Sequence, residues 1–344
     1  MHVSYRLLVR RVAFSVNEMR KTLKKIALVF LIVAVGLWLN NTSLFVRDLE
    51  EHETRLIAHR GVHHIYTGSD RSNDACHASP VEPIAHGFIE NTLPSMREAF
   101  HLGADVVEID VHLTTDDVFA VFHDWTLDCR TNGTGVTHEQ DFALLQSLDI
   151  GYRIDDGTKT FPLRGHGVGR IPSLDSVFED NMEGLFLINF KSRRREEGAA
   201  LAAMLERTHL RQQVFGVYGG EPPTRLAIRS TPGLRGFDKA SLKACLLRYL
   251  ALGWSGYVPT SCRNTIILVP QNYAGLLWGW PHRFTRRLTA VGTDVILAGA
   301  YDGSGFTSGI DDAESFGAVP LSFDGYVWTN RIELIGALNA ARKP

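Results

Sequence analysis

The sequence predicts an α/β fold, a TIM (β/α)8 barrel, because two kinds of apolar segment alternate along it. Runs of strand length alternate with segments whose apolar residues recur at helical spacing. Such alternation is typical of parallel βαβ units, and about eight strands over roughly 290 residues suit a closed barrel with insertions. On pattern alone, a doubly wound open sheet is the second choice. The strand candidates are 56–58, 106–111, 118–122, 185–188, 214–217, 234–237, 294–298 and 325–328.

The helical segments between these runs are less evenly marked. Residues 92–102 have apolar positions at helical spacing, with Asn91 or Thr92 available as an N-cap and Gly103 at the end. Residues 257–280 show no clear pattern. Further helical stretches lie at 196–208, 242–252 and 334–341.

The segment 61–89 has few periodic apolar positions and several His, Ser and Asp residues. We predict that it is a long insertion in the first βα loop, since loops of this length in a compact domain are usually functional or disordered. It would lie over the barrel mouth and shape the choice of substrate. Its histidines are His63, His64, His77 and His86.

The charge of the chain is nearly balanced overall but uneven along its length. The formal net charge of −2 gives no global basic field, so we expect no nucleic-acid partner. The first 25 residues, however, carry seven Lys and Arg residues against Glu18 alone. The remainder is correspondingly acidic, which separates this basic segment from the barrel.

An apolar run, 26–39, follows the basic segment and predicts an N-terminal transmembrane helix. Counted to Val46 through a polar but uncharged break, the run reaches the roughly 20 residues that cross a bilayer. We therefore expect a basic cytoplasmic segment at 1–25, a signal anchor at 26–46 and a barrel at 47–344, with the barrel periplasmic or extracellular. A cleaved signal peptide is the alternative, but no small-x-small cleavage site follows the run.

The four cysteines give no sign of a zinc site, because none belongs to a C-x-x-C pair. Export would allow disulfides. Cys76 and Cys129 both fall in loops on one predicted barrel face, so a bridge between them is one hypothesis. Four free thiols, with Cys245 and Cys262 included, are the alternative.

Polar clusters recur at or near the carboxyl ends of the predicted strands, the face that holds the active site of a parallel barrel. Any one of them could be a helix cap or a structural hydrogen bonder, but several in succession favour a site. The clusters are His59-Arg60-Gly61, Glu90-Asn91-Thr92, Glu108-x-Asp110, His123-Asp124 and Asn189-x-Lys191.

Glu108 and Asp110 are two residues apart on one strand, so both carboxylates point the same way. Two such charges disfavour joint ionisation unless a cation lies between them, and oxygen ligands suit Mg²⁺ or Ca²⁺. A glycosidase would place its two carboxylates on opposite sides of a sugar bond, which one strand supplies poorly.

The remaining groups suit phosphoryl transfer. His59 and His123 form a candidate acid–base pair, since imidazole titrates near neutral pH. Arg60 and Lys191 are cations that can bind a phosphate. A metal, cations and two histidines around one cavity describe phosphoryl transfer better than acyl or glycosyl transfer.

Taken in order, these residues resemble the glycerophosphodiester phosphodiesterase family. The similarity covers most of the chain after residue 55, densely to Lys191 and sparsely afterwards. It rests on the clusters above together with Leu93-Pro94-Ser95, Gly103-Ala104-Asp105, Thr114-x-Asp116-Asp117, Thr131-Asn132-Gly133-x-Gly135, Ile171-Pro172-Ser173-Leu174 and Val327-Trp328-Thr329-Asn330.

The resemblance implies a metal-dependent phosphoric diester hydrolase on a TIM barrel. It would cleave a small-molecule or lipid phosphodiester: a glycerophosphodiester, or a lysophospholipid, giving glycerol 3-phosphate, or a lysophosphatidate, and an alcohol. The implied roles are acid–base catalysis for His59 and His123, metal binding for Glu108 and Asp110, phosphate contact for Arg60 and Lys191, and support of the metal or the glycerol hydroxyls for Glu90.

Two departures from the family pattern matter. The family usually has Glu as a third metal ligand where this chain has Asn189. An amide oxygen can bind Mg²⁺ or Ca²⁺ without adding charge, so we expect weaker metal binding; the alternative is a weakened or inactive phosphodiester-binding protein. The loop 61–89 is also much longer than usual. Trp278 and Trp280 could add an apolar lip for an acyl chain, although core packing is the commoner use of such residues.

Overall fold

The computed structural model describes residues 2–43, 54–70, 75–180, 182–303 and 308–342. Its centre is a sheet of parallel strands in the order β6-β5-β4-β2-β1-β9-β8-β7. In the described residues no ladder joins β6 to β7, but the Thr265 hydroxyl donates a hydrogen bond to the Gly236 carbonyl (2.7 Å) across this seam. The sheet is therefore a nearly closed barrel, as predicted. Its strands are β1 Arg55–His59, β2 Val106–Leu113, β4 Leu185–Phe190, β5 Val214–Gly219, β6 Gly236–Phe237, β7 Ile266–Pro270, β8 Asp294–Ala298 and β9 Tyr326–Thr329.

One predicted barrel strand was wrong. The run 118–122 contains β3 (Phe119–Val121), which pairs antiparallel with β2 and lies off the barrel path. The link between β2 and β3 is far too short for a parallel crossover, which needs a dozen or more residues, so the chain turns back as a hairpin. The true eighth strand is β7, inside the segment 257–280 that showed no clear pattern.

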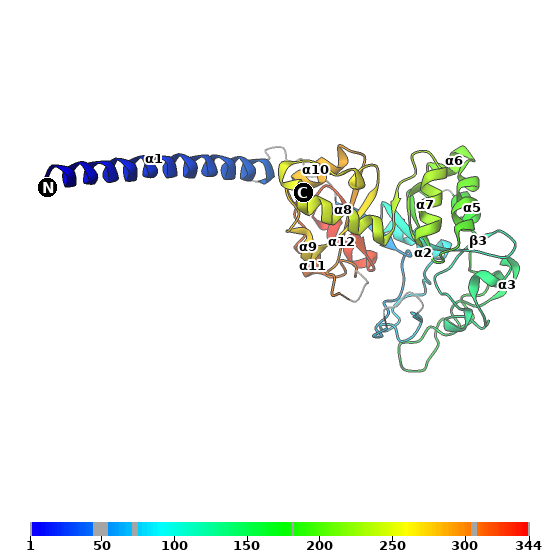
Figure 1. Cartoon of the computed structure of the whole chain (residues 1–344). Helices are drawn as coiled ribbons and strands as arrows, with labels where there is room; N and C mark the ends of the chain where they lie inside the picture. The colour runs from blue at the N-terminus through cyan, green and yellow to red at the C-terminus, as the bar shows by residue number, and fades with distance from the viewer. Residues whose placement is uncertain (1, 44–53, 71–74, 181, 304–307, 343–344) are drawn as a thin grey trace.

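Helices cover the outside of the barrel (Figure 1). The helix after β1 begins at Thr92, whose hydroxyl accepts from the Ser95 amide, so Thr92 rather than Asn91 is the N-cap. The α-helices are α2 Leu93–His101, α3 Phe142–Ser147, α4 Leu174–Glu179, α5 Arg195–Leu205, α6 Thr208–Arg211, α7 Glu221–Ser230, α8 Lys239–Leu252, α9 Gln271–Ala274, α10 His282–Thr289, α11 Ala313–Gly317 and α12 Ile332–Ala341. Single 3₁₀ turns lie at η1 Leu127–Cys129, η2 Thr137–Glu139, η3 Gly253–Ser255 and η4 Thr260–Cys262.

Two apolar layers follow from the alternation of side chains along each strand. On β2, Val107 and Ile109 belong to the layer between strands and helices. Val106 belongs to the cluster inside the barrel, with Ile57, Leu187 and other inward residues. Residues two apart share a face, so the side chains that continue inward above Val106 are polar and reach the barrel mouth.

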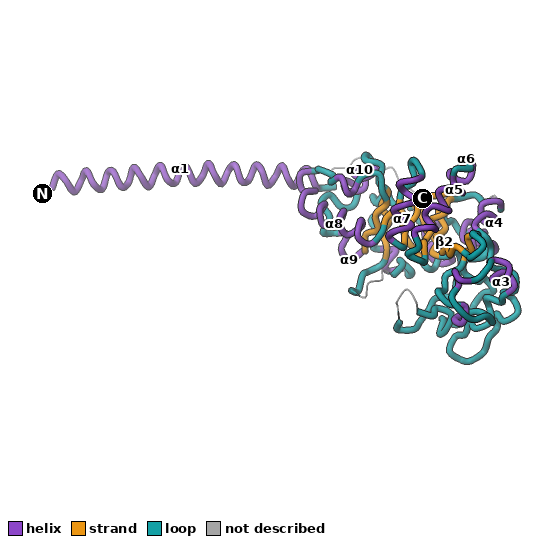
Figure 2. The backbone as a smooth tube through the Cα atoms, turned by 45° about the vertical axis from the view of Figure 1, so that its right-hand side comes forward, coloured by secondary structure: helices purple, strands orange, loops and turns teal. Residues whose placement is uncertain are grey.

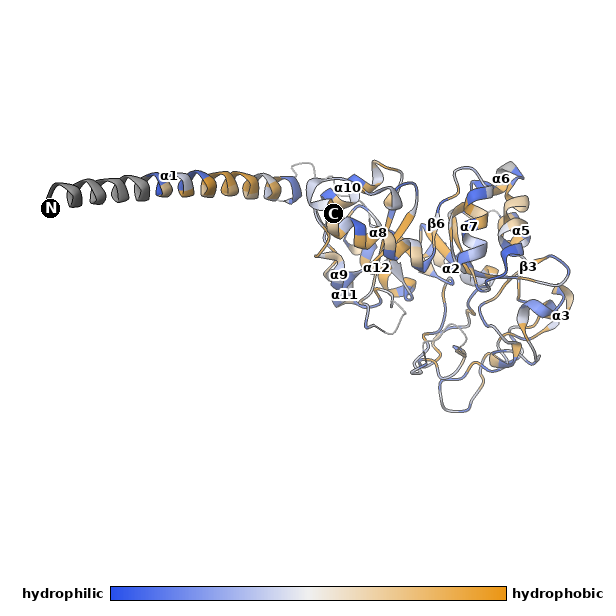
Figure 3. Ribbon diagram, viewed as in Figure 1, coloured by the Kyte–Doolittle hydropathy of each residue, from blue (hydrophilic) through white to orange (hydrophobic). Residues whose placement is uncertain are grey.

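The N-terminal segment forms one helix, α1 (His2–Asn41), that projects from the barrel (Figure 1). Its part from Glu18 to Asn41 is 24 residues long, unburied, and long and apolar enough to cross a membrane; Figure 3 colours much of this part as hydrophobic. The predicted boundary at residue 25 thus falls within a continuous helix, and 44–46 lie outside the described residues. A signal sequence has the same features, so the anchor stays a prediction.

Loops gather at the end of the barrel where the strands have their carboxyl ends (Figure 2). The predicted insertion after β1 packs there against the segment between β3 and β4. Ala78, Val81 and Ile89 share a small apolar core with Leu127 and Leu145. A disulfide joins Cys76 to Cys129 across the two segments, as hypothesised. A second, Cys245–Cys262, joins α8 to η4, so the alternative of four free thiols was wrong.

Candidate active site

The turn after β1 is shaped by backbone conformation. Arg60 (φ 59°) and Gly61 (φ 78°) are both left-handed, a region that costs a non-glycine residue about 1 kcal/mol or more. A Cβ on Gly61 would lie 2.3 Å from the Ser95 hydroxyl. That hydroxyl donates to the carbonyls of Arg60 (3.2 Å) and Val62 (2.9 Å). Helix α2 thereby fixes the turn that directs His59 and Arg60 into the mouth.

Asp110 is the centre of the site. It is fully buried on β2 and its two oxygens are surrounded by donors. Asn189 donates to it from β4 (2.8 Å) and Asn91 from the start of α2 (3.0 Å). The Arg60 guanidinium lies 3.2 Å and the Lys191 ammonium 3.8 Å from its oxygens. Burial opposes its ionisation, but these two cations outweigh burial and hold the pKa of Asp110 below its ordinary value.

The pKa of Glu108, the neighbouring carboxyl, shifts in the opposite direction. It accepts from the Tyr218 hydroxyl on β5 (2.6 Å) and lies 3.7 Å from the His59 Nε2. Burial and the charge of Asp110 raise the pKa of Glu108 to about 8. The two carboxyls therefore compete for ionisation, as the spacing predicted.

Both histidines are held at Nδ1, which leaves Nε2 for chemistry. The Nδ1 of His59 contacts the Asn330 side-chain oxygen (2.5 Å), and Asn330 in turn donates to Asp311 (2.7 Å). The Nδ1 of His123 contacts the Asp124 carboxylate (2.8 Å). An amide oxygen and a carboxylate only accept, so each imidazole carries its proton on Nδ1. The pKa of each histidine lies well below its ordinary value, mainly because the ring is buried and secondly because Arg60 is near. Both imidazoles are therefore neutral at rest, and each can accept a proton at Nε2.

A buried ion-pair network supports this arrangement. Arg130 bridges Glu90 and Asp124, at 2.8 Å from each, and Arg60 also contacts Glu90 (3.2 Å). Burial opposes ionisation of Glu90, but Arg130 and Arg60 outweigh it and lower its pKa. Glu90 thus connects Arg60, which contacts Asp110, to Arg130 and through it to Asp124, which holds the His123 ring.

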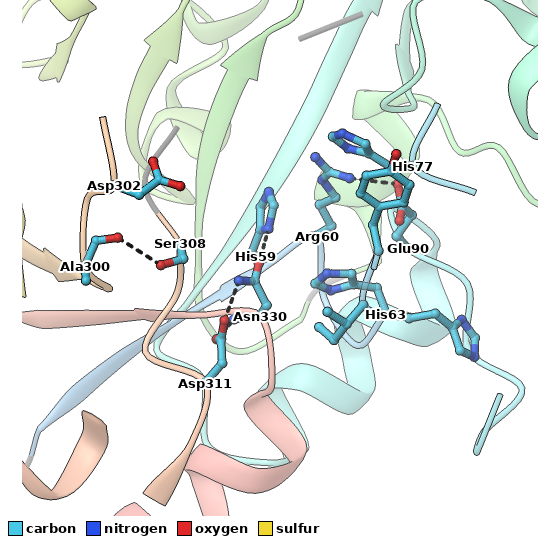
Figure 4. A pocket seen from close by; sticks show the side chains of 13 residues that line it. His59, Arg60, His63, His77, Glu90, Ala300, Asp302, Ser308, Asp311 and Asn330 are labelled. Carbon is cyan, nitrogen blue, oxygen red and sulfur yellow. Dashed lines mark hydrogen bonds and ion pairs between the residues drawn. The ribbon is translucent and has the colours of Figure 1, made fainter. Parts of the chain in front are cut away.

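The first loop forms one wall of a cavity of about 290 Å³ at the mouth (Figure 4). His63 packs edge-on against His59 (ring centroids 5.4 Å apart), and His77 stacks on His123 (5.0 Å). Both are buried. The predicted position of this loop over the mouth is confirmed, and it adds aromatic surface beside both candidate acid–base groups.

The structure brings all eight predicted site residues together, and it adds others that the sequence reasoning missed. Tyr218 and Asn330 stand at the carboxyl ends of β5 and β9, where polar residues after apolar runs could have been noticed. Arg130 follows η1 in an irregular segment, and no local signal marks it. Trp278 and Trp280 are not among the residues that line the cavity, and Trp280 packs on Phe284 and Phe323, the commoner use of such residues.

The donor set suits a hard divalent cation. Two carboxyls compete for ionisation on one strand, and a cation between them would remove the conflict. The Asn189 side-chain nitrogen donates to Asp110. Rotation of the amide by 180° would exchange its nitrogen and oxygen and turn the oxygen toward a cation beside Asp110. Glu90, His123 and Asp124 also bring ligand atoms within 4.8 Å of one another. Arg130 already bridges Glu90 and Asp124, just as Arg60 and Lys191 contact Asp110. We favour the Glu108–Asp110 pair because a cation would relieve the conflict between its two carboxyls.

Fold and site together define a TIM barrel with a cation-rich acid–base centre. A profile of the Glycerophosphoryl diester phosphodiesterase family matches residues 59–214. A curated glycerophosphodiester phosphodiesterase of Caldanaerobacter subterraneus subsp. tengcongensis is 36% identical over 102 residues, which cover 30% of this chain and 39% of that relative. The aligned segments span about two fifths or less of the curated relatives that the chain matches.

Solved structures show the same fold over nearly the whole barrel. The glycerophosphoryl diester phosphodiesterase domain of a Mycobacterium tuberculosis protein has a TM-score of 0.59 at 17% identity, covering 85% of this chain and 100% of that one. A phosphodiesterase of Oleispira antarctica, solved with its product sn-glycerol-3-phosphate, has a TM-score of 0.50 at 20% identity, covering 83% and 96%. Residues 59–214 are thus similar to the glycerophosphodiester phosphodiesterase family, and the solved structures show that the chain shares their fold.

Proposed function

We propose that this chain is a metal-dependent glycerophosphodiester phosphodiesterase that releases glycerol 3-phosphate and an alcohol. The observation that carries the proposal is the pair of histidines, each fixed at Nδ1, near a buried carboxyl pair with two cations. A decayed binding protein would have no evident use for this arrangement. The alternative is an inactive phosphodiester-binding protein, and the assay below would detect it.

The residues of the chain divide the work as follows. One imidazole Nε2 takes a proton from the attacking hydroxyl or water. The other imidazole gives a proton to the departing alcohol after it has itself been protonated on Nε2, a form that the bound phosphodiester anion favours. Arg60 and Lys191 offset the charge of the phosphate. Glu108 and Asp110, with the Asn189 oxygen, would hold Mg²⁺ or Ca²⁺, which when bound stabilises the charge that develops on the phosphoryl oxygens.

We also propose that the barrel is carried outside the cytoplasm. The seven cations before the apolar run favour a cytoplasmic N-terminus, with a basic segment at 1–25, an anchor at 26–46 and the barrel at 47–344. Two disulfides support an oxidising compartment for the barrel. A membrane-anchored enzyme of this class would meet lipid phosphodiesters or their breakdown products.

The test is product release by the purified full chain in detergent. Glycerophosphocholine is assayed for glycerol 3-phosphate and lysophosphatidylcholine for lysophosphatidate, each with Mg²⁺, with Ca²⁺ and with a chelator. Metal-dependent release supports the proposal, and the preferred substrate defines the acyl requirement. A folded protein that binds metal but releases neither product would favour the binding-protein alternative.

The role of Asn189 gives a sharper prediction. The variant N189E should bind the divalent cation about tenfold or more tightly, because a third carboxylate then faces the ion. N189Q is the matched control, since it has the length of Glu but remains neutral. Titration calorimetry with Mg²⁺ and Ca²⁺ measures both variants. Equal affinities for N189E, N189Q and the parent chain would show that residue 189 is not a ligand.

A further inference from the structure

The end of α1 is attached to the barrel at one defined place. The side chains of Asn40 and Asn41 donate to the Trp254 carbonyl (3.3 and 2.9 Å). Arg287 of α10 donates to the Asn40 carbonyl (2.7 Å), and Arg283 donates to the Thr42 carbonyl (2.9 Å). Cations near the carboxyl end of a helix are favourable. These contacts fix which face of the barrel adjoins the candidate membrane span (Figure 1).

Exposed apolar side chains surround this attachment point. Leu247, Leu250 and Trp254 follow one another at helical spacing from α8 into η3. The Trp278 indole donates to the Leu250 carbonyl (2.8 Å), which seats its ring at the end of α8. Soluble proteins rarely expose such groups together without a use for them. We call this set the foot patch, and its members are Leu247, Leu250, Trp254, Tyr257, Leu276 and Trp278.

The composition of the foot patch matches the surface of a bilayer better than that of a protein partner. Trp and Tyr are enriched at the level of lipid headgroups, where one end of each ring is apolar and the other wet. Arg283 and Arg287 lie beside the patch and hold the end of α1 at this level. The apolar surface of α1 continues to Leu39, directly before the asparagines that bind Trp254. The headgroup level therefore coincides with the patch.

The same face continues to the rim of the cavity. Asn272 of α9 exchanges two hydrogen bonds with the backbone of Tyr301, both of 3.0 Å. Tyr273 lies 6.4 Å from the Tyr301 ring. The residues on either side of Tyr301, Ala300 and Asp302, line the cavity. A surface that rests on lipid at α8 thus extends through α9 to the mouth.

We infer that the foot patch is a membrane-docking surface whose occupant is the lipid bilayer, so that the barrel lies against the membrane rather than being held away from it by α1. The inference rests on the anchoring of α1 put forward above and not on the hydrolytic activity. Docking of this face brings the cavity rim toward the headgroups, where an amphiphilic phosphodiester is concentrated.

The test places an environment-sensitive fluorophore on single added cysteines in the full chain. The four native cysteines are paired, so the parent chain serves as the control for labelling. W254C and L276C report the foot patch, and V33C reports insertion of α1. L144C and V168C are matched controls, because Leu144 and Val168 are 43% and 56% exposed against 45% for Trp254 and 63% for Leu276. The protein is reconstituted in phosphatidylethanolamine–phosphatidylglycerol vesicles, with or without lipid that carries a quencher near the headgroup for the surface labels, or in the acyl chain for the label at 33.

We expect the labels at 254 and 276 to lose about half or more of their fluorescence to the quencher, as for groups buried several ångströms into the interface, and those at 144 and 168 to lose almost none. Quenching at 33 but not at 254 and 276 would overturn docking while leaving the anchor intact. A concentration-dependent spectral shift without quenching would assign the patch to a second copy of the chain and also overturn it. Quenching at 254 and 276 without quenching at 33 would support docking and reject the anchor. None of these results depends on turnover.

Discussion

Two halves of this barrel share the same secondary structure and differ in the residues at the ends of their strands. In the site half, formed by β1, β2 and β4 with their loops, the strands end in charged and polar side chains that meet at Asp110. In the anchor half, formed by β6 to β8 with α8 to α10, the last residues of the strands are Phe237, Pro270 and Ala298. The family profile ends at residue 214, close to the boundary between the halves.

The loops explain the difference. The site half carries both long insertions, which a disulfide and a shared apolar core hold over the mouth. The anchor half has shorter connections at the mouth, and its exposed apolar residues lie instead around the end of α1. The proposed chemistry and the proposed attachment therefore fall on different parts of one fold.

The largest effect that this comparison predicts is on turnover. H59A and H123A should each lower kcat about a hundredfold to ten-thousandfold, the usual contribution of a general acid or base. H282A, on α10 in the anchor half, should leave kcat unchanged. Rates are measured on the preferred substrate, with circular dichroism and melting temperatures to confirm that each variant folds. Near-normal rates for either His59 or His123 would remove that residue from the mechanism.

The sequence predicted the site half well because its signals are local. Glu108 and Asp110 share a face through strand spacing alone, and His59 and Lys191 follow apolar runs directly. The anchor half gave weaker signals. The strand β7 was missed because Ile266 to Val269 lie in a segment crowded with other apolar residues, and β3 was assigned to the barrel because an apolar run does not reveal the direction of its partner.

The missed support residues have a common physical reason. Arg130 meets Glu90 and Asp124, and Tyr218 meets Glu108, only after distant segments have folded together. Such contacts depend on tertiary packing rather than on periodicity. The same holds for the foot patch, whose members come from α8, η3, the loop after η3 and the turn after α9. Sequence patterns therefore locate polar side chains at the ends of strands. They do not locate the residues of other segments that contact those side chains in the folded protein.

The next largest effect concerns stability. R130A should destabilise the fold by about 3–5 kcal/mol, because it leaves Asp124 buried without its cation and Glu90 with Arg60 alone. The comparable change in the anchor half is R235A, which breaks a partly exposed pair with Asp294 (2.6 Å) and should cost only about 1 kcal/mol. Urea unfolding in detergent measures both.

The cause of the Arg130 effect can be separated from simple loss of packing. Adding E90Q and D124N to R130A removes the uncompensated charges, so most of the lost stability should return. If the triple variant is no more stable than R130A, the buried carboxylates are not the source of the loss. If R130A lowers the free energy of unfolding no more than R235A does, the ion-pair network does not distinguish the two halves.

The smallest expected effect compares the two disulfides. Cys76–Cys129 and Cys245–Cys262 close loops of 53 and 17 residues, for which the chain-entropy relation gives about 4 and 3 kcal/mol. C76S/C129S should therefore lose slightly more stability than C245S/C262S, by about 1 kcal/mol in urea unfolding.

The two double variants should differ more clearly in activity. The first bridge adjoins His77, which stacks on His123, so its loss should lower kcat at temperatures where the protein stays folded. Removal of the second bridge should leave kcat near that of the parent chain, since α8 and η4 contribute no residue to the cavity. Equal losses of kcat in both variants would mean that the halves are mechanically coupled, and the division of labour between them would not hold.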